Sequence, residues 1–80
     1  MPRYFFDVQD GGLIPDLDGT ELASVDAARY EAATALADLA RDVLPGSHHR
    51  EIIIEVHEEA GPILVTARLL FEMATQKTSQ

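Results

Sequence analysis

One alanine-rich helical segment lies between two pairs of apolar strands, and this order constrains the fold more than any other feature of the chain. Alanine occupies seven positions between residues 26 and 44, and Leu36, Leu39 and Val43 recur there on one stripe at helical spacing. The flanking apolar runs are residues 4–6, 52–54 and 63–65. The pattern predicts a β-β-α-β-β domain.

The strands are predicted by alternation of apolar and polar residues. In residues 3–9, Tyr4, Phe6 and Val8 share one face, and a turn at residues 10–12 follows. A short second strand at residues 13–14 belongs at a sheet edge, because Pro15 cannot donate to a ladder. Residues 51–58 and 63–71, with Ile63 inward, form the last two predicted strands.

The helix is expected from about Ser24 to Leu44, with Ser24 as its N-cap and Pro45-Gly46 as its end. A right-handed return across the sheet gives four antiparallel strands in the order 2-1-3-4, with the helix on one face. The fold class is α+β. The expected core consists of Phe6, Val8, Ala32, Leu36, Leu39, Val43, Ile54, Val56 and Val65.

Eighty residues allow one modest core. We assign residues 1–71 to a single domain and residues 72–80 to a polar C-terminal tail that is expected to be flexible.

The acidic turn before the helix invites two interpretations. Aligned as an EF-hand loop, it lacks the first ligand and the final bidentate carboxylate, so no metal site is expected. Arg29 lies near the apolar stripe of the helix, within reach of Asp16 and Asp18 beside Gly19. We predict that Asp16, Asp18, Gly19 and Arg29 form a structural clasp, and a ligand-binding role for Arg29 remains the alternative.

Charge limits the partners. Fourteen acidic residues against six basic ones give a net charge of −8, which repels nucleic acid. The charge either keeps the protein soluble or offers an acidic face to a basic partner. No apolar run is long enough to span a membrane, and no signal peptide is evident at the start. The absence of cysteine favours the cytoplasm.

Catalytic groups are sparse. There is no cysteine nucleophile, and the serines lie at the predicted cap, linker and tail. His48, His49 and His57 are expected to be solvated, because their spacing does not match a metal site. We therefore expect no catalytic residues, no cofactor and no metal.

The sheet face away from the helix is unusually apolar. Phe5, Ile53, Leu64 and Leu70 lie on it among polar residues, and a contiguous patch would favour a protein partner or self-association. Sheet twist or a folded-back C-terminal segment could instead scatter or cover these side chains.

Three short stretches, residues 2–6, 16–22 and 27–32, resemble an uncharacterised family of very short single-domain proteins from rhizobia and related alphaproteobacteria. The family is a domain of unknown function, so the resemblance implies no catalytic or ligand residues. It does imply that Asp16, Gly19 and Arg29 belong to one recurring structural device. A looser similarity, in architecture only, is to antitoxin domains of the HicB type, which often continue into a DNA-binding segment that is absent here.

The sequence thus favours a non-enzymatic interaction module of a small acidic bacterial protein. A domain that binds a small metabolite and a HicB-like regulator remain the alternatives.

Overall fold

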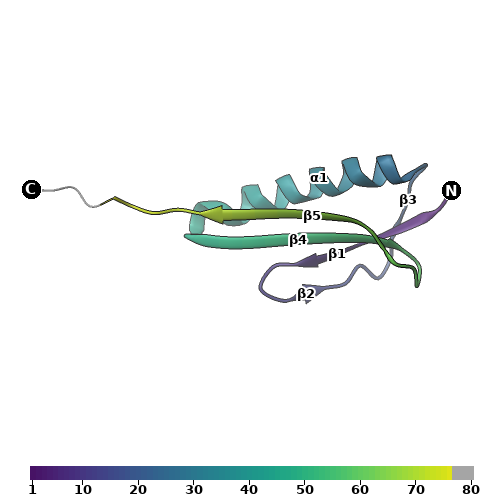
Figure 1. The fold of residues 1–80 in the computed structure, drawn as a ribbon, viewed down its shortest axis with the longest axis horizontal. Coiled ribbons are helices and arrows are strands. Elements are labelled where there is room, and N and C mark those ends of the chain that lie inside the picture. The colour runs from purple at the N-terminus through teal and green to yellow at the C-terminus, as the bar shows by residue number, and fades with distance from the viewer. Residues whose placement is uncertain (77–80) are drawn as a thin grey trace, which may run out of the picture.

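The computed structural model describes residues 1–76 and shows one helix lying along a twisted antiparallel sheet (Figure 1). The chain order is β1 (Arg3–Gln9), β2 (Leu13–Ile14), β3 (Thr20–Glu21), α1 (Val25–Val43), the 3-10 turn η1 (Leu44–Gly46), β4 (His49–Glu58) and β5 (Ile63–Glu72). The predicted α+β class is confirmed. Of the predicted tail, residues 77–80 lie outside the described residues.

The sheet has the order β2-β1-β4-β5, and all of its neighbouring strands are antiparallel. These are the four predicted strands in the predicted order. The sequence did not predict β3, in which Glu21 and Thr20 pair with Arg3 and Tyr4 at the start of β1. Two residues are too few to show alternation, so this strand leaves no periodic signal. β4 also begins two residues earlier than predicted, at His49 rather than at residue 51.

The helix begins and ends where its capping residues predict. The Ser24 hydroxyl accepts a hydrogen bond from the Ala27 amide at 3.2 Å, and Asp26 adds negative charge to the first turn. After Val43 the chain tightens into η1, and the Ser47 hydroxyl donates to the Val43 carbonyl oxygen at 2.7 Å. The prediction of Ser24 as the N-cap is confirmed.

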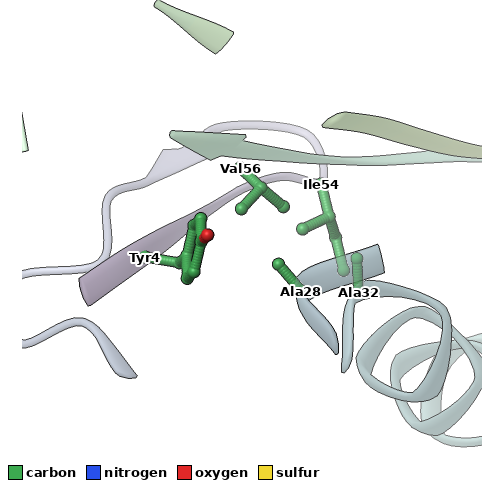
Figure 2. Packing of buried hydrophobic residues seen from close by; sticks show 5 residues of the cluster. All are labelled: Tyr4, Ala28, Ala32, Ile54 and Val56. Atoms are coloured by element: carbon green, nitrogen blue, oxygen red, sulfur yellow. The ribbon is translucent and has the colours of Figure 1, made fainter. Parts of the chain in front are cut away.

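The core lies where the helix crosses the central strands (Figure 2). The buried cluster consists of Tyr4, Ala28, Ala32, Ile54 and Val56. Ile52 is also fully buried. Of the predicted core residues, Phe6, Val8, Leu36, Leu39 and Val65 are half-buried and pack against this cluster, whereas Val43 is half-buried and lies outside it. One helix cannot cover a sheet completely, so complete burial is confined to a few residues of α1 and the central strand β4.

A register shift near the β4–β5 turn changes one predicted orientation. Val56 pairs with Val65, but the next residue of β4, His57, pairs with Ile63. Leu64 is therefore an extra residue on β5, as in a β-bulge. Ile63 lies opposite His57 and is 52% exposed, so the prediction that it points inward is wrong.

Candidate functional site

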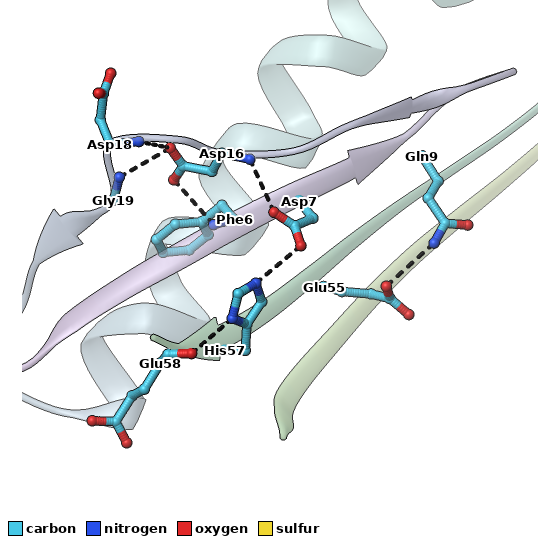
Figure 3. Close-up of polar contacts among 9 residues, drawn as sticks. All are labelled: Phe6, Asp7, Gln9, Asp16, Asp18, Gly19, Glu55, His57 and Glu58. Atoms are coloured by element: carbon cyan, nitrogen blue, oxygen red, sulfur yellow. Dashed lines mark hydrogen bonds and ion pairs between the residues drawn. The ribbon is translucent and has the colours of Figure 1, made fainter. Parts of the chain in front are cut away.

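Asp16 is the centre of the largest polar cluster, on the loop between β2 and β3 (Figure 3). One carboxylate oxygen accepts from the Phe6 amide of β1 at 3.1 Å. The other accepts from the amides of Asp18 and Gly19, at 3.1 and 3.0 Å. The Asp16 amide donates to Asp7 Oδ1 at 2.9 Å. This half-buried carboxylate therefore fastens the loop to β1.

The pKa of Asp16 reflects these bonds. Burial alone would raise it, but the hydrogen bonds from the Gly19, Phe6 and Asp18 amides, together with the charge of His57, hold it below the ordinary value of 3.8. The carboxylate is thus kept ionised because three amide donors stabilise its charge.

Arg29 does not belong to this cluster, so that part of the predicted clasp is wrong. Its side chain is 69% exposed, and its closest charged partner is Asp26, one turn earlier on α1, at 3.7 Å. Ala28 and Ala32, both with no exposed surface, mark the middle of the buried helix face. Arg29 follows Ala28 by about 100° around the helix, which turns it out of the buried face.

Arg3 of β1 takes the place that was predicted for Arg29. Its guanidinium donates to the Asp18 carbonyl oxygen at 2.9 Å and to Glu21 Oε2 at 3.1 Å. Gly19 lies beneath its stem with φ +74°, and a Cβ there would lie 2.7 Å from Arg3 Cγ. Glycine is needed both for this conformation and for the close approach.

We expect Arg3→Met to lower the free energy of unfolding by about 1 kcal/mol, because it removes two exposed hydrogen bonds. Arg29→Met should stay within about 0.5 kcal/mol of the wild type. Urea unfolding of both variants measures the difference. A larger loss for Arg29→Met than for Arg3→Met would contradict the assignment.

His57 forms the second polar contact, and the sequence did not predict it. Nε2 lies 2.9 Å from Asp7 Oδ2, and Nδ1 lies 2.8 Å from the Glu58 carbonyl oxygen. The side chain is 24% exposed and stacks on Phe5, with ring centroids 5.6 Å apart. The expectation that this histidine is solvated is therefore wrong. Alternation placed Asp7 and His57 on one face, but only the register of β1 against β4 shows that they meet.

Both ring nitrogens of His57 face groups that accept hydrogen bonds, so the arrangement suits the doubly protonated imidazolium. The carbonyl of Glu58 raises the pKa of His57, and the hydrogen bond and charge of Asp7 raise it further against the opposing effect of burial. An imidazolium bonded at both nitrogens has no free lone pair to act as a general base. The contact of His57 with Asp7 joins β4 to β1.

The two shifted pKa values predict how stability depends on pH. His57, whose folded pKa is raised, stabilises the fold fully below pH 6.5 and loses this contribution as the pH rises through the folded value. Asp16, whose folded pKa is lowered, contributes above pH 3.8 and loses it as the pH falls through the folded value. Thermal unfolding of wild type and His57→Gln should therefore converge as the pH rises from about 6 to 9. A constant or growing difference would contradict this contact.

The four residues of the predicted interaction face differ in their exposure and in their place on the sheet. Phe5 and Ile53 are half-buried, and Gln9 Nε2 donates to Glu55 Oε1 at 3.2 Å between them. Leu64 and Leu70 are 41% and 60% exposed and lie towards opposite ends of β5. Exposed apolar side chains thus lie along both edge strands of the sheet, with Leu13 and Ile14 on β2 and Ile63, Leu64 and Leu70 on β5.

Two kinds of hollow lie at the surface. Near the β1–β2 turn, two pockets of about 300 and 390 Å³ are lined by Gly11 and Glu51. Arg50, which lines the second pocket, forms a bidentate ion pair with Asp10 at 2.7 and 3.1 Å. An apolar groove of about 420 Å³ lies between the end of α1 and β5. It is lined by Ala37, Ala40, Arg41, Leu44, Pro45, Phe71 and Met73.

Within residues 1–76, no group of three or more potential ligand side chains could hold a metal ion. Across the same residues, no helix is both long enough and apolar enough to cross a membrane.

Comparison with known proteins identifies the family of this chain. Neither a curated protein nor a solved structure matches the chain. A family model described as "Domain of unknown function (DUF6894)" matches residues 3–70, which include every strand and the helix except the last two residues of β5. The chain therefore belongs to the DUF6894 family, a domain of unknown function.

Proposed function

We propose that this protein is a non-enzymatic interaction module that binds protein partners through the free edge of β5. The observation that carries the proposal is the character of this strand. β5 is ten residues long, lies at the end of the sheet order, and has no neighbour on its outer side within the described residues. Strands of this kind bind other chains by extending the sheet.

The hydrogen-bond pattern identifies which main-chain groups of β5 face outward. The Met73 amide donates to the His48 carbonyl oxygen at 2.7 Å, one step beyond the pairing of His49 with Glu72. In an antiparallel pair the bonded residues alternate, so Phe71, Leu69 and Ala67 also bond to β4. The amides and carbonyls of Thr66, Arg68, Leu70 and Glu72 consequently point away from the sheet.

Exposed apolar side chains lie on the same strand as these outward main-chain amides and carbonyls. Large hydrophobic residues at and just beyond β5 remain exposed, namely Ile63, Leu64, Leu70 and Met73. Arg68 and Glu72 are the charged residues of the strand and have opposite signs. A nearly neutral, apolar strand in a chain of net charge −8 favours contact with protein rather than with nucleic acid.

The polar clusters support a non-enzymatic function. Asp16 accepts from three amides, and His57 is bonded at both ring nitrogens, so these groups stabilise the fold. Arg50, which lines one of the pockets near the β1–β2 turn, forms an ion pair with Asp10. The proposal keeps the bacterial cytoplasm as its setting, which follows from the cysteine-free sequence and the resemblance to alphaproteobacterial proteins.

The test compares tagged wild-type protein with Thr66→Pro in pull-downs from native lysate. Proline is tolerated where the replaced amide points outward, so Thr66→Pro should keep the fold while blocking the edge. Tyr30→Ser is the control, because Tyr30 is 77% exposed on α1. We expect the wild type and Tyr30→Ser to capture the same proteins and Thr66→Pro to lose them.

Equal capture by Thr66→Pro, with unchanged thermal unfolding, would contradict the proposal. The metabolite-binding alternative predicts instead a rise of several degrees in the unfolding temperature with one small compound. A HicB-like regulator would depend on a further DNA-binding partner.

A further inference from the structure

We propose that the partner of the β5 edge is a second copy of this chain, paired antiparallel about a two-fold axis at Leu70. This inference rests on the proposed function, because it names the partner of the same strand. Antiparallel pairing about a two-fold axis perpendicular to the sheet places a residue opposite its own copy. It also keeps the helices of both copies on one face.

The bulge limits where the axis can lie. Leu64 interrupts the ladder, so the regular part of the edge begins at Val65. An axis near the start of β5 would include this irregular residue in the contact. An axis at Leu70 uses only the regular edge and the extended residues that follow it.

Charge selects the register within this part of the strand. An axis at Leu70 places Arg68, which lies 3.4 Å from Glu51 within its own copy, opposite the partner's Glu72, and by symmetry this contact forms twice. An axis at Arg68 would place two arginines opposite each other, and an axis at Glu72 would oppose two glutamates. Opposite charges stabilise a cross-strand pair, whereas like charges destabilise it.

The same register matches the other side chains. On the helix side, Leu69 lies opposite the partner's Phe71, and Ala67 opposite the partner's Met73. On the other face Leu70 meets the partner's Leu70, which would cover a side chain that is 60% exposed. The outward amides and carbonyls of Arg68, Leu70 and Glu72 find bonding partners at the same time.

The position of α1 also suits a second copy. The helix packs against both β4 and β5. Helices pack at interaxial distances of about 8–10 Å, which is about two strand spacings, so the helices over the two β5 strands would be within reach of each other across the proposed axis. Ala37 and Ala40, which line the apolar groove, permit this approach. The partner's helix would occupy the groove beside Phe71.

Sedimentation of the purified protein at up to about 1 mM tests the inference. A buffer of about 0.3 M salt screens the repulsion between two acidic chains. We expect a dimer for the wild type and for Tyr30→Ser. Arg68→Glu and Glu72→Arg should each weaken association at least tenfold, whereas the double variant, which exchanges the two charges, should restore it.

A cysteine variant provides evidence that does not depend on the charge swaps. The chain has no cysteine, so Leu70→Cys introduces a single thiol. Residues opposite each other across a two-fold axis lie close enough for a disulfide. Mild oxidation should link Leu70→Cys into a dimer and leave Tyr30→Cys unlinked.

Several results would overturn the inference. A strictly monomeric wild type would do so, as would a double variant no better than the single ones, or equal crosslinking of both thiols. A monomeric pure protein whose pull-down still depends on Thr66 would refute the second copy and leave the proposed function intact. Capture that does not depend on Thr66 would refute the proposed function itself.

Discussion

Replacing Ile54 with alanine should destabilise the protein by about 2–5 kcal/mol. Ile54 has no exposed surface and lies on the central strand β4, beneath Ala28 and Ala32 (Figure 2). Alanines have no long side chain that could move into the cavity, so the site relaxes poorly. A domain of this size has a free energy of unfolding of about 5–15 kcal/mol, so this loss is a large share.

Urea unfolding followed by circular dichroism measures the effect, and Ile53→Ala is the matched control. Ile53 is the neighbour of Ile54 on the same strand, and it is only half-buried on the opposite face of the sheet. The substitution Ile53→Ala removes the same side-chain atoms as Ile54→Ala. Its substitution should cost clearly less. Equal losses at the two positions would contradict the assigned core.

The second large effect is expected at Asp16. Asp16→Ala removes a carboxylate that accepts hydrogen bonds from three amides, one of them on β1. Hydrogen bonds to a charged group contribute about 1.5–3 kcal/mol, so a loss of this order is expected. The loop between β2 and β3 should separate from β1 and take the Arg3 contacts with it.

Asp18→Ala is the control for this prediction. Asp18 lies in the same turn and contributes its main-chain amide and carbonyl, which alanine retains. Its substitution should leave the unfolding free energy within about 0.5 kcal/mol of the wild type. Similar losses of unfolding free energy for both variants would show that the negative charge of the turn, rather than the Asp16 hydrogen bonds, holds the loop.

The sequence predicted those parts of the fold that depend on periodicity and on capping. Alternation identified β1, β4 and β5, and the turn at residues 10–12 together with Pro15 indicated β2. Alanine spacing with Ser24 and Pro45-Gly46 predicted the helix. Handedness then gave the strand order. Each of these signals is local or follows from a general rule, so one sequence contains enough information.

The candidate site required information that periodicity does not carry. Arg3 and Arg29 both lie near the acidic turn in sequence order, but only the pairing of β1 with β3 brings Arg3 to Asp18. The contact between Asp7 and His57 likewise depends on a register between strands fifty residues apart. Long-range register was the missing information in both cases.

The sequence predicted which apolar residues lie on the sheet face away from the helix, but not which of them remain exposed. Alternation assigns Leu64 and Leu70 to the same face as Phe5 and Ile53, but alternation cannot show which of these side chains neighbouring strands cover. The β-bulge at Leu64 also changes the direction of Ile63. Exposure along β5 therefore appears only once the strands are assembled.

Residue-by-residue amide hydrogen exchange along β5 tests the central claim most directly. In dilute protein, the amides of Ala67, Leu69 and Phe71 should exchange slowly because they bond to β4, while those of Thr66, Arg68 and Leu70 should exchange fast. Binding of a partner should slow this second set selectively. Slow exchange of Thr66, Arg68 and Leu70 in the dilute protein, or no change when a partner binds, would contradict the assignment of β5 as the interaction edge.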